Sequence, residues 1–363
     1  MRDRGRFLIY GAAGYTGRLL VERSLARGLA PILAGRRAAS LAELGTSTRC
    51  ETRAAPLSDA EGMARLLDGV SVVLSAAGPF SQTAGPLMDA CLNAGAHYLD
   101  ISGEIAAFEA ARARGPRARS SGVMLMPGVG FDVVPSDCLA AHVARALPGA
   151  THLRLGVSGL GLVSKGSALT LCEQLGQPLT VRRNGQLTAL PQGSLQRNFD
   201  FGRGAQRCSA VSWADVASAH YTTGIDNIEV YFESNALVRA TLAWSRYAGW
   251  ALGTPAGQAW LKAHTIYVPL GPAPEARRAR SATIVAEASD PSGHRVSARL
   301  VAPEAYTTTA LTAVAIAERV LLGDAEPGFN TPARVYGPDF VLGIQGIHRD
   351  PPRYADQVVE FRQ

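Results

Sequence analysis

An apolar run followed by three glycines, spaced three residues apart, constrains the fold of this chain more than any other feature. Residues 7–10 lead into Gly11, Gly14 and Gly17, and a helical stretch follows from Arg18. This order predicts a strand, a tight turn and a helix: Gly11 lets the chain reverse, Gly14 admits a diphosphate to the backbone, and Gly17 lets the helix approach the strand. Because a helix N-terminus favours anions, we expect the pyrophosphate of a dinucleotide there. The residues between the glycines that we expect to contact it are Ala13, Tyr15 and Thr16.

The end of the second predicted strand indicates which dinucleotide binds. Residues 30–35 form an apolar segment that ends in Arg36 and Arg37. In dinucleotide-binding folds an acid at this position binds a free ribose hydroxyl, whereas an arginine accommodates a 2'-phosphate. No acid stands there, so we predict NADP (NADPH) as the cofactor. The alternative is an ordinary solvated pair of arginines.

Strand and helix patterns then alternate to residue 137, which is typical of a parallel sheet with helices on both faces. We therefore predict a Rossmann doubly wound domain over residues 1–137, with Asp59 as a helix cap. Its later strands are predicted at residues 51–56, 70–75, 96–100 and 122–126. Small residues follow the strand at 70–75, where they leave room for the ribose and phosphates of the cofactor or simply form a turn. These residues are Ala76, Ala77, Gly78 and Pro79.

Polar residues near the ends of the next two strands are the candidates for catalysis. We predict Asp132, Asp100 and Tyr98 as catalytic residues and Ser102 as a cofactor contact, with Asp132 favoured because glycines and prolines constrain its loop. Each residue also has a structural alternative: Tyr98 as core, Asp100 and Ser102 as turn hydrogen-bonding groups, and Asp132 as a local cap. Glu104, at the start of the next helix, is expected by default to cap it, and orienting a ligand is the alternative. Residues 136–137 are the predicted N-cap of a helix over residues 138–147.

From Thr151 the pattern changes to alternating strands, which predicts a second, α+β domain over residues 138–304 with a mixed or antiparallel sheet. A hairpin turn is expected at residues 290–293. A long helix at 307–322 is expected to return, with the whole of 305–363, to the first domain. Lys165 lies in a glycine-rich loop and is a candidate for mutation. Residues 236–252 resemble an amphipathic helix, for packing or for peripheral membrane contact.

Length and composition limit the remaining possibilities. The 363 residues exceed what one core usually serves, and 47% hydrophobic with 18% charged residues fits a soluble globular enzyme. The net charge of +6 is scattered, which argues against a nucleic-acid partner. Five cysteines at wide spacing, without C-x-x-C, argue against disulfides and a metal site, so we expect a cytoplasmic protein. The first strand begins too near Met1 for a signal peptide, and no membrane span is expected.

Several of these stretches together resemble the saccharopine dehydrogenase-like family of NADP-binding oxidoreductases, which includes saccharopine reductases and trans-acting enoyl reductases. The matching stretches are residues 11–17, 34–37, 77–80, 90–91, 95–104 and 130–137, with weaker similarity at 164–167, 327–333 and 337–341. The resemblance implies an NADP-dependent oxidoreductase whose second domain contacts the substrate and often forms a homodimer.

The resemblance leaves the hydride acceptor open. An enoyl thioester, which makes the partner a small-molecule or carrier-bound acyl substrate, needs donors for an enolate oxygen and an apolar second domain. An imine derived from an amino acid needs arginines for its carboxylates. A non-catalytic NADP-binding sensor is the third alternative. The four tryptophans of the second domain favour the enoyl thioester; they are Trp213, Trp244, Trp250 and Trp260.

Overall fold

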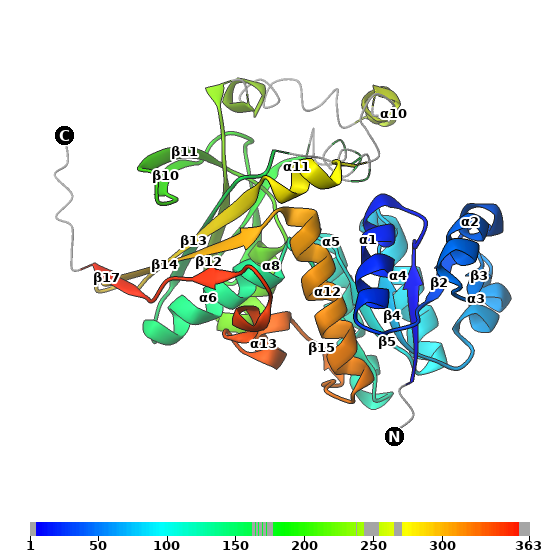
Figure 1. The fold of residues 1–363 in the computed structure, drawn as a ribbon. Helices are drawn as coiled ribbons and strands as arrows, with labels where there is room; N and C mark the ends of the chain where they lie inside the picture. Colours follow the sequence, from blue (N-terminus) through cyan, green and yellow to red (C-terminus); the bar gives the residue numbers. More distant parts are fainter. Residues whose placement is uncertain are drawn as a thin grey trace. The chain divides into compact units, whose positions relative to one another are not determined.

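The computed structural model describes residues 5–161, 164, 166, 169, 172, 177–236, 238–242, 254–264 and 271–355. The chain forms two compact units (Figure 1). Unit 1 comprises residues 1–134 and 305–335, and unit 2 comprises residues 135–304 and 336–363. Lys165, Trp244 and Trp250 lie outside the described residues, as does most of the predicted helix at 236–252.

Unit 1 is built on a parallel sheet, which confirms the predicted Rossmann architecture. In the described part of the chain this sheet has seven strands in the order β15-β6-β5-β4-β1-β2-β3. The strands are β1 (Arg6–Tyr10), β2 (Ile32–Gly35), β3 (Thr52–Ala54), β4 (Val70–Ser75), β5 (His97–Asp100), β6 (Met124–Met126) and β15 (Gly328–Phe329). The central strands β1 and β4 are apolar and buried because helices cover both faces. The strand order reverses between β1 and β4, and ligands of open α/β sheets bind at the carboxyl ends of such strands.

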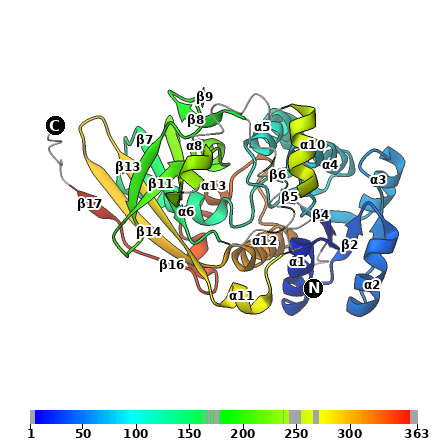
Figure 2. The ribbon, with the colours of Figure 1, turned by 90° about the horizontal axis from the view of Figure 1, so that it is seen from above.

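The helices of unit 1 lie on the two faces of this sheet. The helices α1 (Tyr15–Ala26), α2 (Ala38–Thr48) and α12 (Ala305–Leu321) lie on one face, and α3 (Ala60–Leu67), α4 (Phe80–Ala94) and α5 (Ile105–Ser120) on the other (Figure 2). Helix α12 packs beside α1, where Tyr15 and Tyr306 meet edge to face with ring centroids 5.2 Å apart. The predicted cap Asp59 is confirmed, since its carboxylate accepts the backbone N–H of Gly62 at 2.9 Å.

Two helices begin earlier than the sequence predicts. Helix α4 begins at Phe80, whereas its sequence pattern predicts a start at residue 84, and helix α6 (Val134–Ala146) begins four residues before the predicted start at 138. The predicted N-cap at Ser136 and Asp137 is therefore wrong, and both residues lie inside the first turn of α6. Pro135 fits this turn because the first N–H groups of a helix need no intrahelical partner. Asp137 instead accepts the hydroxyl hydrogen of Thr222 at 2.6 Å.

Unit 2 contains a mixed sheet, as predicted. Among the described residues its main path runs β10-β11-β12-β7-β13-β14-β16. Its strands are β7 (His152–Ser158), β8 (Leu179–Arg183), β9 (Gln186–Leu190), β10 (Gln196–Asp200), β11 (Ala205–Ala210), β12 (Asn227–Glu233), β13 (Ser281–Ser289), β14 (Arg295–Pro303), β16 (His348–Arg349) and β17 (Arg353–Ala355). Strands β7 and β12 run parallel, while β7–β13 and β13–β14 run antiparallel.

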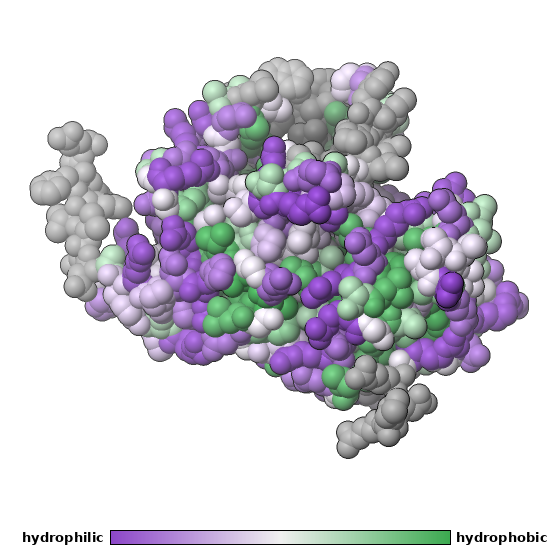
Figure 3. All heavy atoms as spheres, viewed as in Figure 1, coloured by the Kyte–Doolittle hydropathy of each residue, from purple (hydrophilic) through white to green (hydrophobic). Residues whose placement is uncertain are grey.

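The β13–β14 hairpin turns at the predicted residues, where Asp290 accepts the N–H of Gly293 and Gly293 has a φ of +90°. Other helices of this unit are α8 (Asp215–Thr223), α10 (Pro255–His264) and α11 (Pro274–Arg278). The β10–β11 edge is covered by hydrophilic side chains (Figure 3), which discourage further strand pairing.

The end of the chain corrects the predicted domain division. Residues 305–335 lie in unit 1, but residues 336–355 belong to unit 2, so the expectation that all of 305–363 packs on the first domain is wrong. The physical reason is strand pairing, because both β16 and β17 form hydrogen bonds with the edge of β14 that β13 leaves open. Residues 332–349, for which the resemblance implies a strand or loop, begin with α13 (Pro332–Tyr336) and a 3-10 helix (Phe340–Gly343) and end in the strand β16.

No helix in the described ranges combines the length and the apolar character that crossing a bilayer requires. Within the same ranges, no cluster of three or more potential metal ligands occurs.

Candidate functional site

The glycine turn between β1 and α1 has no room for side chains at two of its three glycines. Gly11 has a φ of +87°, and a Cβ there would lie 2.9 Å from the backbone carbon of Ala76 and the nitrogen of Ala77. A Cβ on Gly17 would lie 2.2 Å from the carbonyl oxygen of Gly11. These two glycines therefore let the turn pass close to the end of β4 and let α1 pack against β1, as the sequence predicts for Gly17.

Gly14 differs from its neighbours, because a Cβ there would approach a single backbone atom instead of clashing with several. It is the N-cap of α1 with an extended backbone, φ −71° and ψ 166°, and a Cβ would meet only the Gly11 oxygen, at 3.3 Å. No side chain caps α1, and its first turn contains no acid. The N–H groups at the start of α1 are thus available to an anion, and a side chain at residue 14 would stand in front of them.

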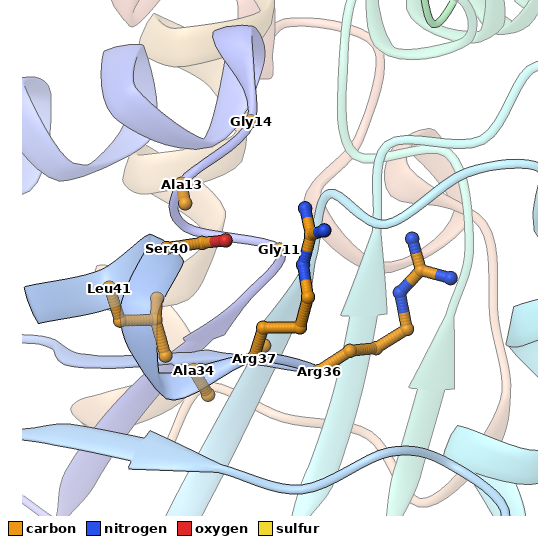
Figure 4. A pocket seen from close by; sticks show the side chains of 9 residues that line it. Gly11, Ala13, Gly14, Ala34, Arg36, Arg37, Ser40 and Leu41 are labelled. Atoms are coloured by element: carbon orange, nitrogen blue, oxygen red, sulfur yellow. The ribbon is translucent and has the colours of Figure 1, made fainter.

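A hollow of about 120 Å³ lies beside this turn (Figure 4). Its lining contains no carboxylate in the part of the chain that the structure describes; it consists of Gly11, Ala13, Gly14, Ala34, Gly35, Arg36, Arg37, Ser40 and Leu41. Arg36 and Arg37 are exposed at the end of β2; in Figure 4 the guanidinium group of Arg37 lies beside Gly11, whereas that of Arg36 extends away from the glycine turn. Arg36 also lies near Tyr10, where its charge partly offsets the burial that raises the pKa of Tyr10. The hollow thus combines positive charge with the uncapped start of α1.

Sequence reasoning missed two parts of this hollow. Ser40 lies in the first turn of α2, and Figure 4 shows its hydroxyl group directed toward the glycine turn. Helix α2 has Arg37 as its N-cap, without a side-chain cap and without an acid in its first turn. The run of small residues after Arg37 could have identified this second helix N-terminus. Both features add to the attraction for an anion.

The turn after β4 is fixed by hydrogen bonds to neighbouring segments. The N–H of Ala76 donates to the carbonyl of Tyr10 at 2.8 Å, and the Gly78–Pro79 peptide bond is cis. The hydroxyl group of Thr83 donates to the carbonyl of Ala77 at 2.5 Å. The turn therefore lies against the end of β1, where the sequence places the cofactor contacts Ala76 to Pro79.

Tyr98 and Asp100 are both fully buried, and they hydrogen-bond to each other. The Tyr98 hydroxyl donates to Oδ2 of Asp100 at 2.7 Å, while the backbone N–H groups of Ser102 and Gly128 donate to Oδ1 at 2.8 and 2.9 Å. Burial raises the pKa of Asp100 to about 6 despite these three donors, and burial with the Asp100 charge raises that of Tyr98 well above its usual value. The arrangement ties the loop after β5 to the loop after β6, so it favours the structural alternative for both residues.

Ser102 and Glu104 belong to the same hydrogen-bond network. The hydroxyl oxygen of Ser102 accepts the backbone N–H of Glu104 at 3.0 Å. Glu104 precedes α5, but its carboxylate does not cap that helix, so the predicted role is wrong. The carboxylate reaches the start of α4 instead, where it accepts the N–H groups of Phe80 and Ser81.

Asp132 lies beside this network and keeps part of its surface exposed. A Cβ on Gly103 would lie 2.6 Å from its Oδ2, so the Asp132 carboxyl group packs against the loop that precedes Glu104. Burial and the negative charge of Glu104 raise the pKa of Asp132 to about 7. A carboxyl group with such a pKa can hold or release a proton near neutral pH. Asp132 is thus the predicted catalytic residue whose surroundings best suit proton transfer.

Two of the four tryptophans of unit 2 are described. Trp213 packs against Phe232 with ring centroids 4.8 Å apart. Trp260, on α10, is 60% exposed and stacks on His264. Neither contact forms an enclosed apolar chamber.

Comparison with known proteins agrees with this geometry. Residues 7–126 match the family described as "Saccharopine dehydrogenase NADP binding domain". This part of the chain is therefore similar to the NADP-binding domain of saccharopine dehydrogenases. The matched residues run from the start of β1 to the end of β6 and include the glycine turn and the arginine pair. The prediction of an NADP-binding Rossmann domain is therefore confirmed.

Curated relatives resemble the chain over a limited region. A probable mitochondrial saccharopine dehydrogenase-like oxidoreductase of Arabidopsis thaliana is 31% identical over 147 residues, which are 36% of this chain and 32% of the relative. The trans-acting enoyl reductase of Mycobacterium leprae is 30% identical over 138 residues, 36% of this chain and 33% of the relative. The match thus spans about a third of each relative's length.

One solved structure shares the fold of nearly the whole chain. It is the apo saccharopine dehydrogenase (L-Glu forming) of Saccharomyces cerevisiae, with a TM-score of 0.63 and 11% identity over 97% of this chain and 100% of that chain. The two proteins therefore share a fold.

Proposed function

We propose that this protein is an NADPH-dependent reductase that transfers hydride to the polarised double bond of an enoyl thioester. The observation that carries the cofactor part is the hollow beside the glycine turn, with two exposed arginines and no carboxylate in its described lining. NADPH, when bound, supplies the hydride. The identity of the acceptor is supported by the similarity of 36% of the chain to a trans-acting enoyl reductase.

The residues of the site fit this cofactor. The uncapped start of α1 offers backbone N–H groups to a diphosphate, and Gly14 leaves them accessible. Arg36 and Arg37, with Ser40, provide charge-assisted and neutral donors for a 2'-phosphate. We assign the β4–α4 turn, Ala76 to Pro79, to the remaining part of the cofactor, since it lies at the carboxyl end of the strand beside β1.

Asp132 is the group that we assign to proton transfer. Hydride addition to an enoyl thioester leaves an enolate, which must be stabilised by hydrogen bonds and then protonated. With its pKa raised to about 7, the Asp132 carboxyl group is partly protonated at neutral pH and can donate that proton. Tyr98 and Asp100 are proposed to support the loops around it.

Reduction of an imine derived from an amino acid is the second candidate. It is favoured by the fold that nearly the whole chain shares with a saccharopine dehydrogenase. Such a substrate carries carboxylates, which would require arginine partners in the second unit. An NADP-binding sensor without turnover is the third candidate, because a proton donor other than Asp132 is not evident among the described residues of unit 1.

A single set of assays separates these candidates. The oxidation of NADPH is followed by absorbance with enoyl thioesters of increasing chain length and, separately, with amino acids paired with aldehydes or keto acids. Consumption with the thioesters alone supports the proposal, and consumption with the imine-forming pairs alone replaces it with the second candidate. NADPH binding without turnover in either set would support the third candidate, an NADP-binding sensor.

We further propose that the protein acts in a reducing compartment such as the cytoplasm, and that unit 2 forms a homodimer. All five cysteines are thiols in the structure, which motivates the first proposal. The second rests on the resemblance to the family. Cell fractionation and sedimentation equilibrium test them, and a secreted or strictly monomeric protein would contradict them.

A further inference from the structure

We propose that Glu104 is a positioning residue of the cofactor site, whose carboxylate holds the β4–α4 turn in place against the glycine turn. This inference rests on the proposed function insofar as the turn contacts NADPH. It assigns a task to a residue that is part of neither the glycine turn nor the arginine pair.

The carboxylate of Glu104 completes the start of α4. Pro79 is the N-cap of α4 and has no side-chain cap hydrogen bond, and the first turn of this helix contains no acid. The N–H of Phe80 donates to Oε1 of Glu104 at 3.0 Å, and that of Ser81 donates to Oε2 at 2.7 Å. A carboxylate that accepts two donors at a helix N-terminus forms charge-assisted bonds and interacts favourably with the helix dipole.

These bonds fix the position of the cofactor turn. Phe80 and Ser81 directly follow Ala76 to Pro79, and the backbone of Ala76 and Ala77 lies so close to Gly11 that a Cβ on that glycine would clash with it. Any shift at the start of α4 would therefore be transmitted to the contact with the glycine turn. Thr83 supports the same turn from inside α4, because its hydroxyl group donates to the carbonyl groups of Ala77 and Pro79.

Glu104 is itself held in place by β5. Its backbone N–H donates to the Ser102 hydroxyl oxygen, and the N–H of Ser102 donates to the buried Asp100. The bonds thus run from the end of β5 through Glu104 to the turn after β4. Three neighbouring loops at the carboxyl edge of the sheet are joined in this way, since Asp100 also binds the N–H of Gly128 after β6.

Glu104 also acts electrostatically on Asp132. Glu104, on the loop before α5, is the charged side chain that raises the pKa of Asp132 in addition to burial. On the loop that contains Asp132, Gly130 lies next to the uncharged Thr309 of α12. Asp100 and Tyr98 on β5 are turned toward each other and toward backbone donors. Removing the charge of Glu104 should therefore lower the pKa of Asp132.

The test compares three variants by NADPH titration, thermal unfolding and pH dependence. Glu104→Gln keeps the size of the side chain but removes its charge, and Thr83→Val removes the hydroxyl support without removing a charge. Glu109→Gln is the control, because Glu109 lies one turn further along α5 and pairs with Arg112 at the surface. We expect Glu104→Gln and Thr83→Val to weaken NADPH binding about tenfold, from the cost of ordering a loosened turn, and Glu109→Gln to leave it unchanged.

The pH dependence separates positioning from general stability. The change in melting temperature caused by Asp132→Asn is measured as a function of pH, in the wild type and in each variant. In the Glu104→Gln background, the pH range in which this change develops should move to lower pH. In the Thr83→Val background, the range should stay the same. A lowered melting temperature with wild-type NADPH affinity and an unmoved pH range would overturn the proposal. Glu104→Asp, which keeps the charge but shortens its reach, replaces Glu104→Gln if that variant does not fold; it should weaken NADPH binding while keeping the pH range.

These measurements need no hydride acceptor. If the wild type binds NADPH but reduces nothing, the proposed reductase function fails while the comparison of affinities still tests Glu104. If the wild type does not bind NADPH, both proposals fail together. If the wild type reduces its substrate and Glu104→Gln binds NADPH as tightly as the wild type, only the inference about Glu104 is contradicted.

Discussion

Replacing Gly14 by Val tests whether the middle glycine of the turn serves the cofactor or the fold. Gly14 has extended backbone angles that any residue adopts, and a Cβ there would meet only the Gly11 oxygen, at 3.3 Å. We expect the variant to lose about 1 kcal/mol of stability or less. Its side chain would stand in front of the N–H groups at the uncapped start of α1. Loss of hydrogen bonds to a charged diphosphate, worth about 1.5–3 kcal/mol each, predicts NADPH binding weakened about 100-fold.

Gly17→Ala is the matched control, because its main expected effect is a loss of stability. Its Cβ would lie 2.2 Å from the Gly11 oxygen and 2.8 Å from the Ala12 oxygen, and both are backbone atoms that cannot rotate away. Helix α1 would have to move from β1, at a cost of about 1–3 kcal/mol or more. NADPH fluorescence titration and thermal unfolding are measured on the same preparation of each variant. Wild-type NADPH affinity in Gly14→Val would refute the reasoning, and unfolding of Gly14→Val would show that Gly14 serves packing.

The further predictions concern three polar residues of unit 1. Asp100→Ala should lower stability by about 3 kcal/mol or more, because it leaves three buried donors without an acceptor, whereas Asp100→Asn should unfold near the wild-type temperature; equal melting temperatures for the two variants would contradict this structural role. Asp132→Asn should reduce turnover about 100-fold with NADPH affinity nearly intact, and an unchanged rate would remove Asp132 from the site. Because the pKa of Asp132 rises to about 7 in the folded protein, its carboxyl group lowers the stability increasingly as the pH rises from about 4 to about 7. The melting temperature of Asp132→Asn should therefore rise relative to that of the wild type over this range. A gain independent of pH would contradict the assignment. Ser40→Ala should weaken NADPH binding by about fivefold and leave NADH binding unchanged, and an equal loss for both cofactors would exclude a contact with the 2'-phosphate.

Features set by neighbouring residues could be predicted from the sequence. The spacing of Gly11 and Gly17 predicts the tight turn, Asp59 is recognisable as a helix cap, and residues 290–293 predict a hairpin turn. Each of these features depends on backbone conformation within a few residues. A similar local signal was missed at Asn184 and Gly185, which join β8 to β9 with positive φ angles at both residues. Asn-Gly is the preferred sequence for such a turn, so this hairpin was predictable.

Features that depend on residues far apart in the sequence could not be predicted in this way. Glu104 was expected to cap its own helix, but its carboxylate binds α4, 23 and 24 residues earlier in the chain. The pairing of β16 with β14 likewise joins segments whose own patterns do not indicate each other. Arg36 and Arg37 were predicted from the position of their strand, whereas the contribution of Ser40 depends on how α2 folds back beside the turn.

The measurement that tests the central claim most directly is the titration of the wild type and of Arg36→Ala with NADPH and with NADH. A charge-assisted bond to the 2'-phosphate is worth about 1.5–3 kcal/mol, so we predict that the wild type binds NADPH at least about tenfold more tightly than NADH. Arg36→Ala should lose most of this preference and keep its affinity for NADH. Equal affinities of the wild type for the two cofactors, or an unchanged preference in Arg36→Ala, would contradict the assignment of the hollow beside the glycine turn as an NADP site.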